Sequence, residues 1–155
     1  MSMRAGVGKC TVLCEDRVAV NLSIELETVM CAQEPAVDIH DTAFDDGSWT
    51  PGHDAYVLGC GLDPNRLGQR FAAVAMSAVP RVLDAGALTW LSGRSVSILG
   101  ANCVLTPHPK EAAILLGRTV AEVESDRLLA VDELSETYGC VVALKGAYTL
   151  ITAPG

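Results

Sequence analysis

The sequence predicts an α/β fold with a mostly parallel sheet, and two of its patterns carry that prediction. Short apolar runs alternate with stretches of helical periodicity along the chain of 155 residues. Strands separated by helices in this rhythm form β-α-β units, whose strands lie parallel. Glycine, proline or aspartate residues directly follow several of the apolar runs, which places polar and flexible groups at the strand ends where such sheets bind ligands.

The elements follow one another in a regular order. The predicted strands are Cys10–Cys14, Ala55–Leu58, Arg81–Leu83, Cys103–Leu105, Cys140–Leu144 and a closing strand at Thr149–Thr152. The predicted helices are Asn21–Met30, Arg66–Val79, Ala87–Leu91, Lys110–Leu116 and Val120–Tyr138. The last helix has the clearest ends, because Thr119 and Glu122 form a capping box and Gly139 stands where a helix would stop. Its apolar stripe is imperfect: Val120, Val123, Leu128, Val131, Leu134 and Tyr138.

The composition indicates one well-packed domain over residues 1–155. Half of the residues are apolar, 19% are charged, and the formal net charge of −8 argues against a surface that binds nucleic acid. An acidic chain can still hold a nucleotide through backbone amides and one or two cations. No apolar run approaches the roughly 18–20 residues of a membrane span, and no signal peptide precedes the first strand. We therefore expect a soluble protein of the cytoplasm.

The six cysteines, at positions 10, 14, 31, 60, 103 and 140, are spread along the chain without a CxxC pair. Free cysteine is among the residue types most often buried, so we expect buried, reduced thiols rather than disulfides or metal ligands. His40 and His53 also lack the spacing of a metal cluster, and no metal site is predicted. The polar stretch Asp41–Gly52 is expected to be a surface loop.

The first two candidate sites follow the second and third predicted strands. Gly59 and Gly61 flank Cys60, and glycine lets a backbone approach a ligand closely, although a simple tight turn explains them as well or better. Asp84 ends an apolar strand, where a carboxylate must be paired or solvated. It could orient a hydroxyl group or a hydrated Mg²⁺ ion. Capping of the next helix would suit its position equally.

The other two candidates follow the next two strands. His108 lies between Pro107 and Pro109 in a turn at a helix start, where an imidazole can contact a ligand ring. The alternative is a turn histidine that only faces solvent. Lys145 and Gly146 end another apolar strand and offer a cation beside accessible backbone, which suits a phosphate. The alternative is a hairpin connection with an exposed lysine.

The order and spacing of these stretches resemble the NAD(P)H-hydrate dehydratase family, a branch of the ribokinase-like superfamily. Thr106-Pro-His-Pro-Lys-Glu111 is similar to the family's TPHPGE motif and is the most specific part of the match. Shorter stretches are similar to its RAGAG, GPG, DADAL and LKG motifs: Arg4-Ala-Gly-Val-Gly-Lys9, Gly59-Cys-Gly61, Asp84-Ala-Gly-Ala-Leu88 and Leu144-Lys-Gly146. The resemblance implies a three-layer αβα ribokinase-like domain that lacks the first βα unit and the C-terminal helices.

The family's chemistry sets the expected function. The resemblance implies dehydration of hydrated NADH or NADPH with ADP or ATP and Mg²⁺: the ring hydroxyl is phosphorylated, phosphate leaves and the double bond is restored. It implies that Gly61, His108 and Asp84 bind the substrate, Asp84 being the least certain of them. It implies a nucleotide site lined by Lys145, Gly146, Ala147, Tyr148 and Thr149. Because family members commonly form homo-oligomers, further copies of the chain are expected partners.

The chain departs from the family pattern in several places. Cys60 replaces a proline, Gly86 an aspartate and Lys110 a small residue, and Tyr148 is bulkier than usual. The family's GGSGD segment, with its catalytic aspartate, is expected beyond Gly155. No catalytic residue is therefore assigned within the chain, and the 155 residues alone are expected to be inactive or nearly so. Two alternatives stay open: a ribokinase-like small-molecule kinase, and a non-catalytic nucleotide-binding subunit.

Overall fold

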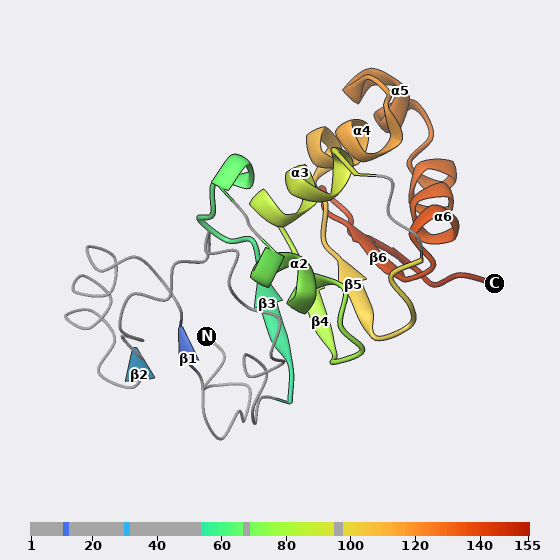
Figure 1. Cartoon of the computed structure of the whole chain (residues 1–155). Coiled ribbons are helices and arrows are strands. Elements are labelled where there is room, and N and C mark those ends of the chain that lie inside the picture. Colours follow the sequence, from blue (N-terminus) through green and yellow to red (C-terminus); the bar gives the residue numbers. More distant parts are fainter. Residues whose placement is uncertain (1–10, 13–29, 32–53, 67–68, 95–97) are drawn as a thin grey trace. The chain divides into compact units, whose positions relative to one another are not determined.

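The computed structural model describes residues 11–12, 30–31, 54–66, 69–94 and 98–155 (Figure 1). The chain divides into two compact units, Met1–Asp38 and Ile39–Gly155. In the first unit, strands β1 (Thr11–Val12) and β2 (Met30–Cys31) pair in parallel. The prediction of a helix that reaches Met30 is therefore wrong at that residue. The rest of that helix and the predicted loop at 41–52 lie outside the described residues.

The second unit is built on a five-stranded sheet whose spatial order follows the chain. Its strands are β3 (Tyr56–Leu58), β4 (Arg81–Leu83), β5 (Cys103–Leu105), β6 (Val141–Leu144) and β7 (Leu150–Thr152). The first four are parallel, and β7 runs antiparallel to β6. The predicted α/β class with a mostly parallel sheet is confirmed.

One face of this sheet is deeply buried. Leu83 pairs with Leu105, and Leu105 with Val142, so all three side chains point to the same face. None of the three is exposed to solvent. Helices α3 (Gly86–Ser92), α4 (Pro109–Leu116) and α6 (Arg127–Tyr138) form a layer beside the sheet (Figure 1). Their buried side chains join the strand residues in one core, which includes Leu88, Leu91, Ala112, Val131 and Leu134.

The predicted helix over residues 120–138 is wrong, because two helices occupy this range. Helix α5 (Val120–Ser125) ends at Asp126, and α6 begins directly after it. Asp126 has φ −146° and ψ 83°, which is not helical, and its carboxylate accepts a hydrogen bond from the backbone N–H of Leu129. The division into two helices also explains why the apolar stripe over residues 120–138 is imperfect. Val120 and Leu128 are exposed, whereas the other four stripe residues are buried.

The helix predicted at Arg66–Val79 is shorter in the structure. A 3₁₀ turn, η2 (Pro64–Arg66), comes first, and α2 spans only Gln69–Ala75. The side chain of Arg81 lies beside the C-terminal end of α2, is 3% exposed and donates to the carbonyl oxygens of Ala75 and Leu99 at 2.6 and 2.7 Å. This buried guanidinium satisfies carbonyl groups of the loops around β4, so it stabilises the base of the sheet.

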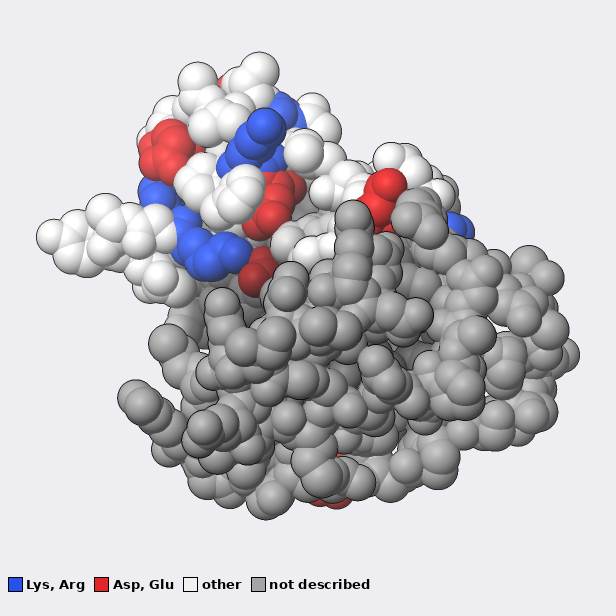
Figure 2. Space-filling model, turned by 90° about the vertical axis from the view of Figure 1, so that its left-hand side faces the viewer, with Lys and Arg blue, Asp and Glu red and all other residues white. Residues whose placement is uncertain are grey.

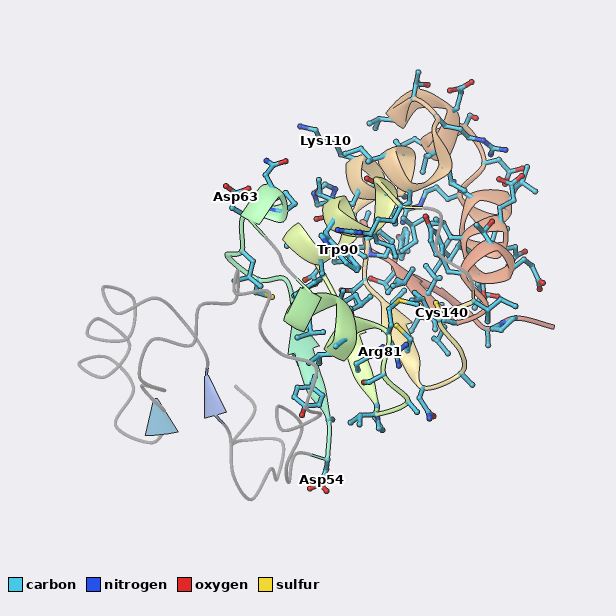
Figure 3. The ribbon with its side chains drawn as sticks, viewed as in Figure 1. Asp54, Asp63, Arg81, Trp90, Lys110 and Cys140 are labelled. Carbon is cyan, nitrogen blue, oxygen red and sulfur yellow. The ribbon has the colours of Figure 1, made fainter. Side chains whose placement is uncertain are left out.

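The thiols agree with the sequence prediction in part. Cys103 and Cys140 are free and buried, and Cys140 lies near Arg81 (Figure 3). Their mutual hydrogen bond lowers the pKa of Cys103, with help from the charge of Arg81 and against the effect of burial; the same bond raises the pKa of Cys140. Cys60 is free but exposed, contrary to the expectation of burial. The side chains of the other three cysteines lie outside the described residues.

Candidate functional site

The carboxyl ends of β4, β5 and β6 are tied together by backbone hydrogen bonds that join the segments after each strand. Thr106 N–H donates to the carbonyl oxygen of Leu83 at 3.1 Å, and Lys145 N–H donates to that of Pro107 at 2.8 Å. Three of the stretches singled out in the sequence, those around Asp84, His108 and Lys145, therefore lie at one edge of the sheet. This is the edge at which open α/β sheets bind ligands.

Lys145 is the centre of a charged cluster at this edge. Its Nζ lies 2.7 Å from Asp84 Oδ1 and 3.9 Å from Glu111 Oε2. Burial by itself raises the pKa of Asp84, but hydrogen bonds from Lys145 and from Ala85 N–H, with the ammonium charge, hold that pKa below its ordinary value. Asp84 is thus ionised at neutral pH. It does not cap α3, whose N-cap, Ala85, makes no side-chain capping bond.

His108 is the N-cap of α4 and shares a capping box with Glu111. The Nδ1 atom of His108 accepts from the backbone N–H groups of Lys110 and Glu111 at 3.1 and 3.2 Å. In return, the carboxylate of Glu111 accepts from His108 N–H at 2.8 Å. Because Nδ1 accepts, the neutral ring carries its proton on Nε2. The side chain is 46% exposed, so this histidine both faces solvent and fixes the helix start.

The turn after β3 packs tightly against the turn after β4. Gly59 has φ +109°, and a Cβ there would overlap the carbonyl oxygen of Asp84 and the side chain of Ala87. Its own carbonyl accepts from Leu62 and Gly86 N–H groups, both at 3.2 Å. Gly61 has φ +74°, with nothing near the position of a Cβ. The tight-turn interpretation therefore accounts for Gly59, and Gly61 remains open to a ligand.

The segment from Lys145 to Thr149 connects β6 to the antiparallel strand β7. It is a hairpin connection, as one sequence interpretation allowed, but its lysine is paired rather than free. Gly146, Ala147, Tyr148 and Thr149 are exposed. The structure thus brings Asp84 and Lys145 into contact, with His108 joined to them through Glu111. Among the described residues, none of these side chains contacts Gly61.

Two residues of this region were missed as site residues by sequence reasoning. Glu111 entered the sequence prediction only as the last residue of the Thr106–Glu111 motif, yet its carboxylate lies between His108 and Lys145. Arg127 was not singled out, and its guanidinium contacts the backbone of the Lys145 segment. The prediction of one helix over 120–138 placed Arg127 inside that helix, so its position at a helix start gave no signal in the sequence.

The charged side chains near this region are mixed in sign. In the coloured part of Figure 2, blue Lys and Arg side chains stand next to red Asp and Glu side chains, without a broad basic patch among them. Elsewhere among the described residues, Arg118 pairs with Glu133 at 2.8 Å and Arg127 with Glu124 at 3.4 Å. Such a surface suits local recognition of a small anion rather than a nucleic-acid backbone.

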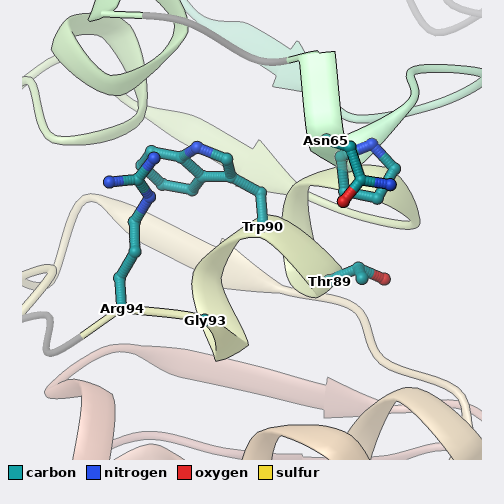
Figure 4. Close-up of a pocket in the computed structure, with 6 residues that line it drawn as sticks. Asn65, Thr89, Trp90, Gly93 and Arg94 are labelled. Atoms are coloured by element: carbon teal, nitrogen blue, oxygen red, sulfur yellow. The ribbon is translucent and has the colours of Figure 1, made fainter.

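A separate cavity of about 320 Å³ lies between η2 and α3 (Figure 4). Arg94 stands 4.3 Å from the centre of the Trp90 ring, and Phe71 meets the same ring edge-on at 5.0 Å. Among the residues that the structure describes, the buried Nε1 atom of Trp90 has no hydrogen-bond partner. Pro64, Asn65, Thr89 and Gly93 complete the lining. None of the residues singled out in the sequence lines this cavity.

The residues at the sheet edge fit Mg²⁺ that arrives with a nucleotide. Mg²⁺ prefers oxygen ligands, keeps several waters and binds through one or two carboxylates plus substrate phosphates. Asp84 and Glu111 supply two carboxylates beside one lysine. Within the described ranges no three histidine, cysteine or acidic residues are grouped to hold a metal by themselves.

The same part of the chain has no helix with both the length and the apolar character that crossing a membrane requires.

Comparisons with known proteins agree with one another. A family model described as NAD(P)H-hydrate dehydratase matches residues 1–155. The ADP-dependent (S)-NAD(P)H-hydrate dehydratase of Neisseria meningitidis is 43% identical over 108 residues, 65% of this chain and 36% of the relative. The bifunctional NAD(P)H-hydrate repair enzyme Nnr of Escherichia coli is 35% identical over 157 aligned positions, 98% of this chain and 28% of the relative.

A solved structure supports the same fold. The ADP/ATP-dependent NAD(P)H-hydrate dehydratase of Bacillus subtilis, co-crystallised with ATP and Mg²⁺, superimposes with a TM-score of 0.79 at 26% identity. The match covers 98% of this chain and 52% of that one. The chain thus spans about half of this structure and a smaller share of the two curated relatives.

Proposed function

The chain belongs to the NAD(P)H-hydrate dehydratase family, and from this premise we propose that its protein dehydrates hydrated NADH or NADPH with ADP or ATP. The relatives in Neisseria meningitidis and Escherichia coli are named for this chemistry or for this repair. The observation that carries the proposal is the cluster of Asp84, Glu111 and Lys145 at the carboxyl edge of a parallel sheet. It places one cation and two carboxylates where a nucleotide and a hydroxylated substrate would meet.

We propose that the adenine nucleotide binds along Lys145, Gly146, Ala147, Tyr148 and Thr149. The ammonium group of Lys145 suits a phosphate as a point charge, and the exposed backbone after it is accessible to a ligand. In the free protein Asp84 neutralises Lys145 at 2.7 Å. A bound phosphate would compete for that lysine, which leaves the carboxylate of Asp84 available to a hydroxyl group or to hydrated Mg²⁺. Bound Mg²⁺ would neutralise phosphate charge.

We propose that the hydrated dinucleotide lies against Gly61, His108 and Asp84. Among the described residues, no atom lies near the position that a Cβ would take at Gly61. The ring of His108 is half exposed, and its Nδ1 atom already accepts hydrogen bonds from the backbone. Because Nε2 lies 3.5 Å from Glu111 Oε1, a ligand would meet the exposed face of that ring. Because Nδ1 holds the start of α4, we expect His108 to orient the substrate rather than to shuttle protons.

The test is a thermal-shift titration of the purified chain with ADP, ATP and AMP, with and without Mg²⁺. A ligand that binds only the folded state adds RT ln(1 + [L]/Kd) to the free energy of unfolding and so raises the melting temperature. We expect a saturable rise with ADP or ATP that Lys145→Ala removes. Lys110→Ala is the matched control, since the side chain of this exposed lysine has no contact with the cluster within the described residues. A cooperative melt that none of the nucleotides shifts would overturn the nucleotide assignment.

The reaction itself is tested on the whole protein with hydrated NADPH. Dehydration releases phosphate and restores reduced cofactor in equal amounts. A stable phosphorylated product would instead identify a small-molecule kinase. Nucleotide binding without any turnover would identify a nucleotide-binding subunit.

We also propose that copies of this chain associate. Ile151 on β7 is 71% exposed and Val57 on β3 is 70% exposed, and these strands stand at the two ends of the described sheet. Apolar side chains on terminal strands favour pairing with another chain. Sedimentation velocity at two concentrations tests this, and a monomer at both would contradict it.

We place the protein in the cytoplasm, where its proposed dinucleotide substrates are used; cell fractionation tests this, and recovery outside the cytosol would contradict it.

A further inference from the structure

Arg127 is bound to the backbone of the segment that follows β6. Its Nη2 atom donates to the carbonyl oxygens of Tyr148, Lys145 and Leu144 at 3.0, 3.2 and 3.4 Å. Leu144 and Lys145 precede the exposed stretch from Gly146 to Thr149, and Tyr148 lies within it. One nitrogen atom therefore ties the beginning of the connection to a residue near its end.

Its position in α6 is unfavourable for a cation. Asp126 ends α5, so α6 starts at Arg127, at the positive end of the helix dipole. The neighbouring Glu124 offsets this only through a contact of 3.4 Å. Helix formation thus does not explain an arginine here, whereas the three carbonyl groups do.

Gly146 shows how closely the two parts fit. A Cβ at Gly146 would overlap the guanidinium of Arg127. The side chain of Arg127 is 21% exposed, and its hydrogen bonds to Lys145 and Tyr148 hold it under the glycine. Any side chain at position 146 must therefore displace either the loop or the arginine.

We propose that Arg127 is a positioning residue for the nucleotide, which it serves by holding the Lys145–Thr149 segment in its binding conformation. The inference rests on the proposed nucleotide site. Lys145 is then fixed at three points: its N–H by Pro107, its carbonyl by Arg127 and its Nζ by Asp84. Without Arg127, the carbonyl group of Lys145 loses this partner. The ammonium group of Lys145 and the backbone amides of residues 145–149 are then no longer held in one conformation before the nucleotide binds. Pre-organisation of this kind raises affinity by lowering the ordering cost of binding.

The experiment compares Arg127→Gln, Arg127→Lys and the control Arg118→Gln in the 155-residue chain. Arg118 is likewise paired with a glutamate, Glu133; its side chain is 36% exposed, against 21% for Arg127, and within the described residues it contacts no part of the segment. Amide hydrogen exchange reports on residues 144–150 without any ligand, and calorimetric titration with Mg-ADP reports affinity. For Arg127→Gln we expect exchange in this segment and the Kd for ADP each to rise about tenfold. Arg127→Lys should fall between, and Arg118→Gln should match the wild type.

A second comparison guards against general destabilisation. Gly146→Ala alone should raise the Kd for ADP, whereas in an Arg127→Ala background it should add little, because the atom it would meet is gone. Additive effects of the two changes would contradict the proposal. The proposal would also be contradicted if Arg127→Gln showed the same exchange pattern as Arg118→Gln. Faster exchange in Arg127→Gln with an unchanged Kd for ADP would contradict it too. A wild-type chain that binds no ADP would overturn the nucleotide site itself, and the exchange contrast would still decide whether Arg127 holds the segment.

Discussion

At the scale of single residues, the site depends on one ion pair between groups far apart in the sequence. Asp84 and Lys145 are separated by 61 positions and lie 2.7 Å apart. Each was singled out separately as a strand-end residue, and the strand ends could be recognised from local patterns. That the two neutralise each other depends on the order of β4, β5 and β6, which periodicity does not specify.

The pH dependence of stability should reveal this pair. The pKa of Asp84 is lowered in the folded state, so folding favours the ionised carboxylate. Its stabilisation is complete above the unfolded pKa of about 3.9 and is lost as the pH falls through the folded value. We expect Asp84→Asn to lower the free energy of unfolding at pH 7 by on the order of 1 kcal/mol, and by less at pH 3. Urea denaturation at pH 7 and pH 3 measures the difference in the free energy of unfolding between the wild type and Asp84→Asn. An equal difference at both pH values would contradict the lowered pKa.

Two glycines in one turn offer a matched comparison. Both have positive φ, but only Gly59 lacks room for a Cβ. Gly61→Ala should cost about 1 kcal/mol of stability, from the backbone conformation alone. Gly59→Ala should cost more than about 3 kcal/mol, because overlap with Asp84 adds to that strain. Chemical denaturation measures both, and similar losses would show that the close approach of the two turns is unimportant.

At the scale of elements, the division between α5 and α6 decides where Arg127 lies. The capping box at Thr119 and the left-handed Gly139 were both predicted, and both are present. The break at Asp126 was not, because a helical stripe with two exposed members still resembles one helix. The available signal was Asp126 itself, since aspartate is a favoured N-cap.

Removal of this cap tests its contribution. Asp126→Ala deletes the hydrogen bond from Leu129 N–H and should lower the free energy of unfolding by about 1 kcal/mol. Ser125→Ala is the neighbouring control, since its hydroxyl only returns to the Glu122 carbonyl within α5, and it should change stability by less than about 0.5 kcal/mol. Equal effects in thermal unfolding would mean that the junction needs no cap.

At the scale of the whole molecule, we propose that residues 1–155 form one domain although the chain divides into units at residue 38. One domain should unfold in a single cooperative transition. Differential scanning calorimetry follows the whole chain, whereas tryptophan fluorescence reports on residues 39–155 alone, since both tryptophans, Trp49 and the buried Trp90, lie there. The two melting curves should coincide. Two separated transitions would show that the units 1–38 and 39–155 fold independently.

The sequence by itself determined the kinds of elements, their order between residues 54 and 155, and the strand ends that carry polar groups. These features arise from hydrophobic periodicity, capping residues and turn residues, which act over a few positions. The order and spacing of the TPHPKE stretch and the shorter motifs indicated the family, but they did not place Glu111 between His108 and Lys145.

Only the tertiary structure decided which of these groups meet. Three features join separate elements: the ion pair of Lys145 with Asp84, the hydrogen bonds from Arg127 to the segment after β6, and the cavity beside Trp90. Such contacts depend on strand order, on register and on where a helix begins, and small changes in any of these move a side chain by several ångströms. Local sequence patterns carry no information about that arrangement, so the chemistry of the site becomes visible only in the folded chain.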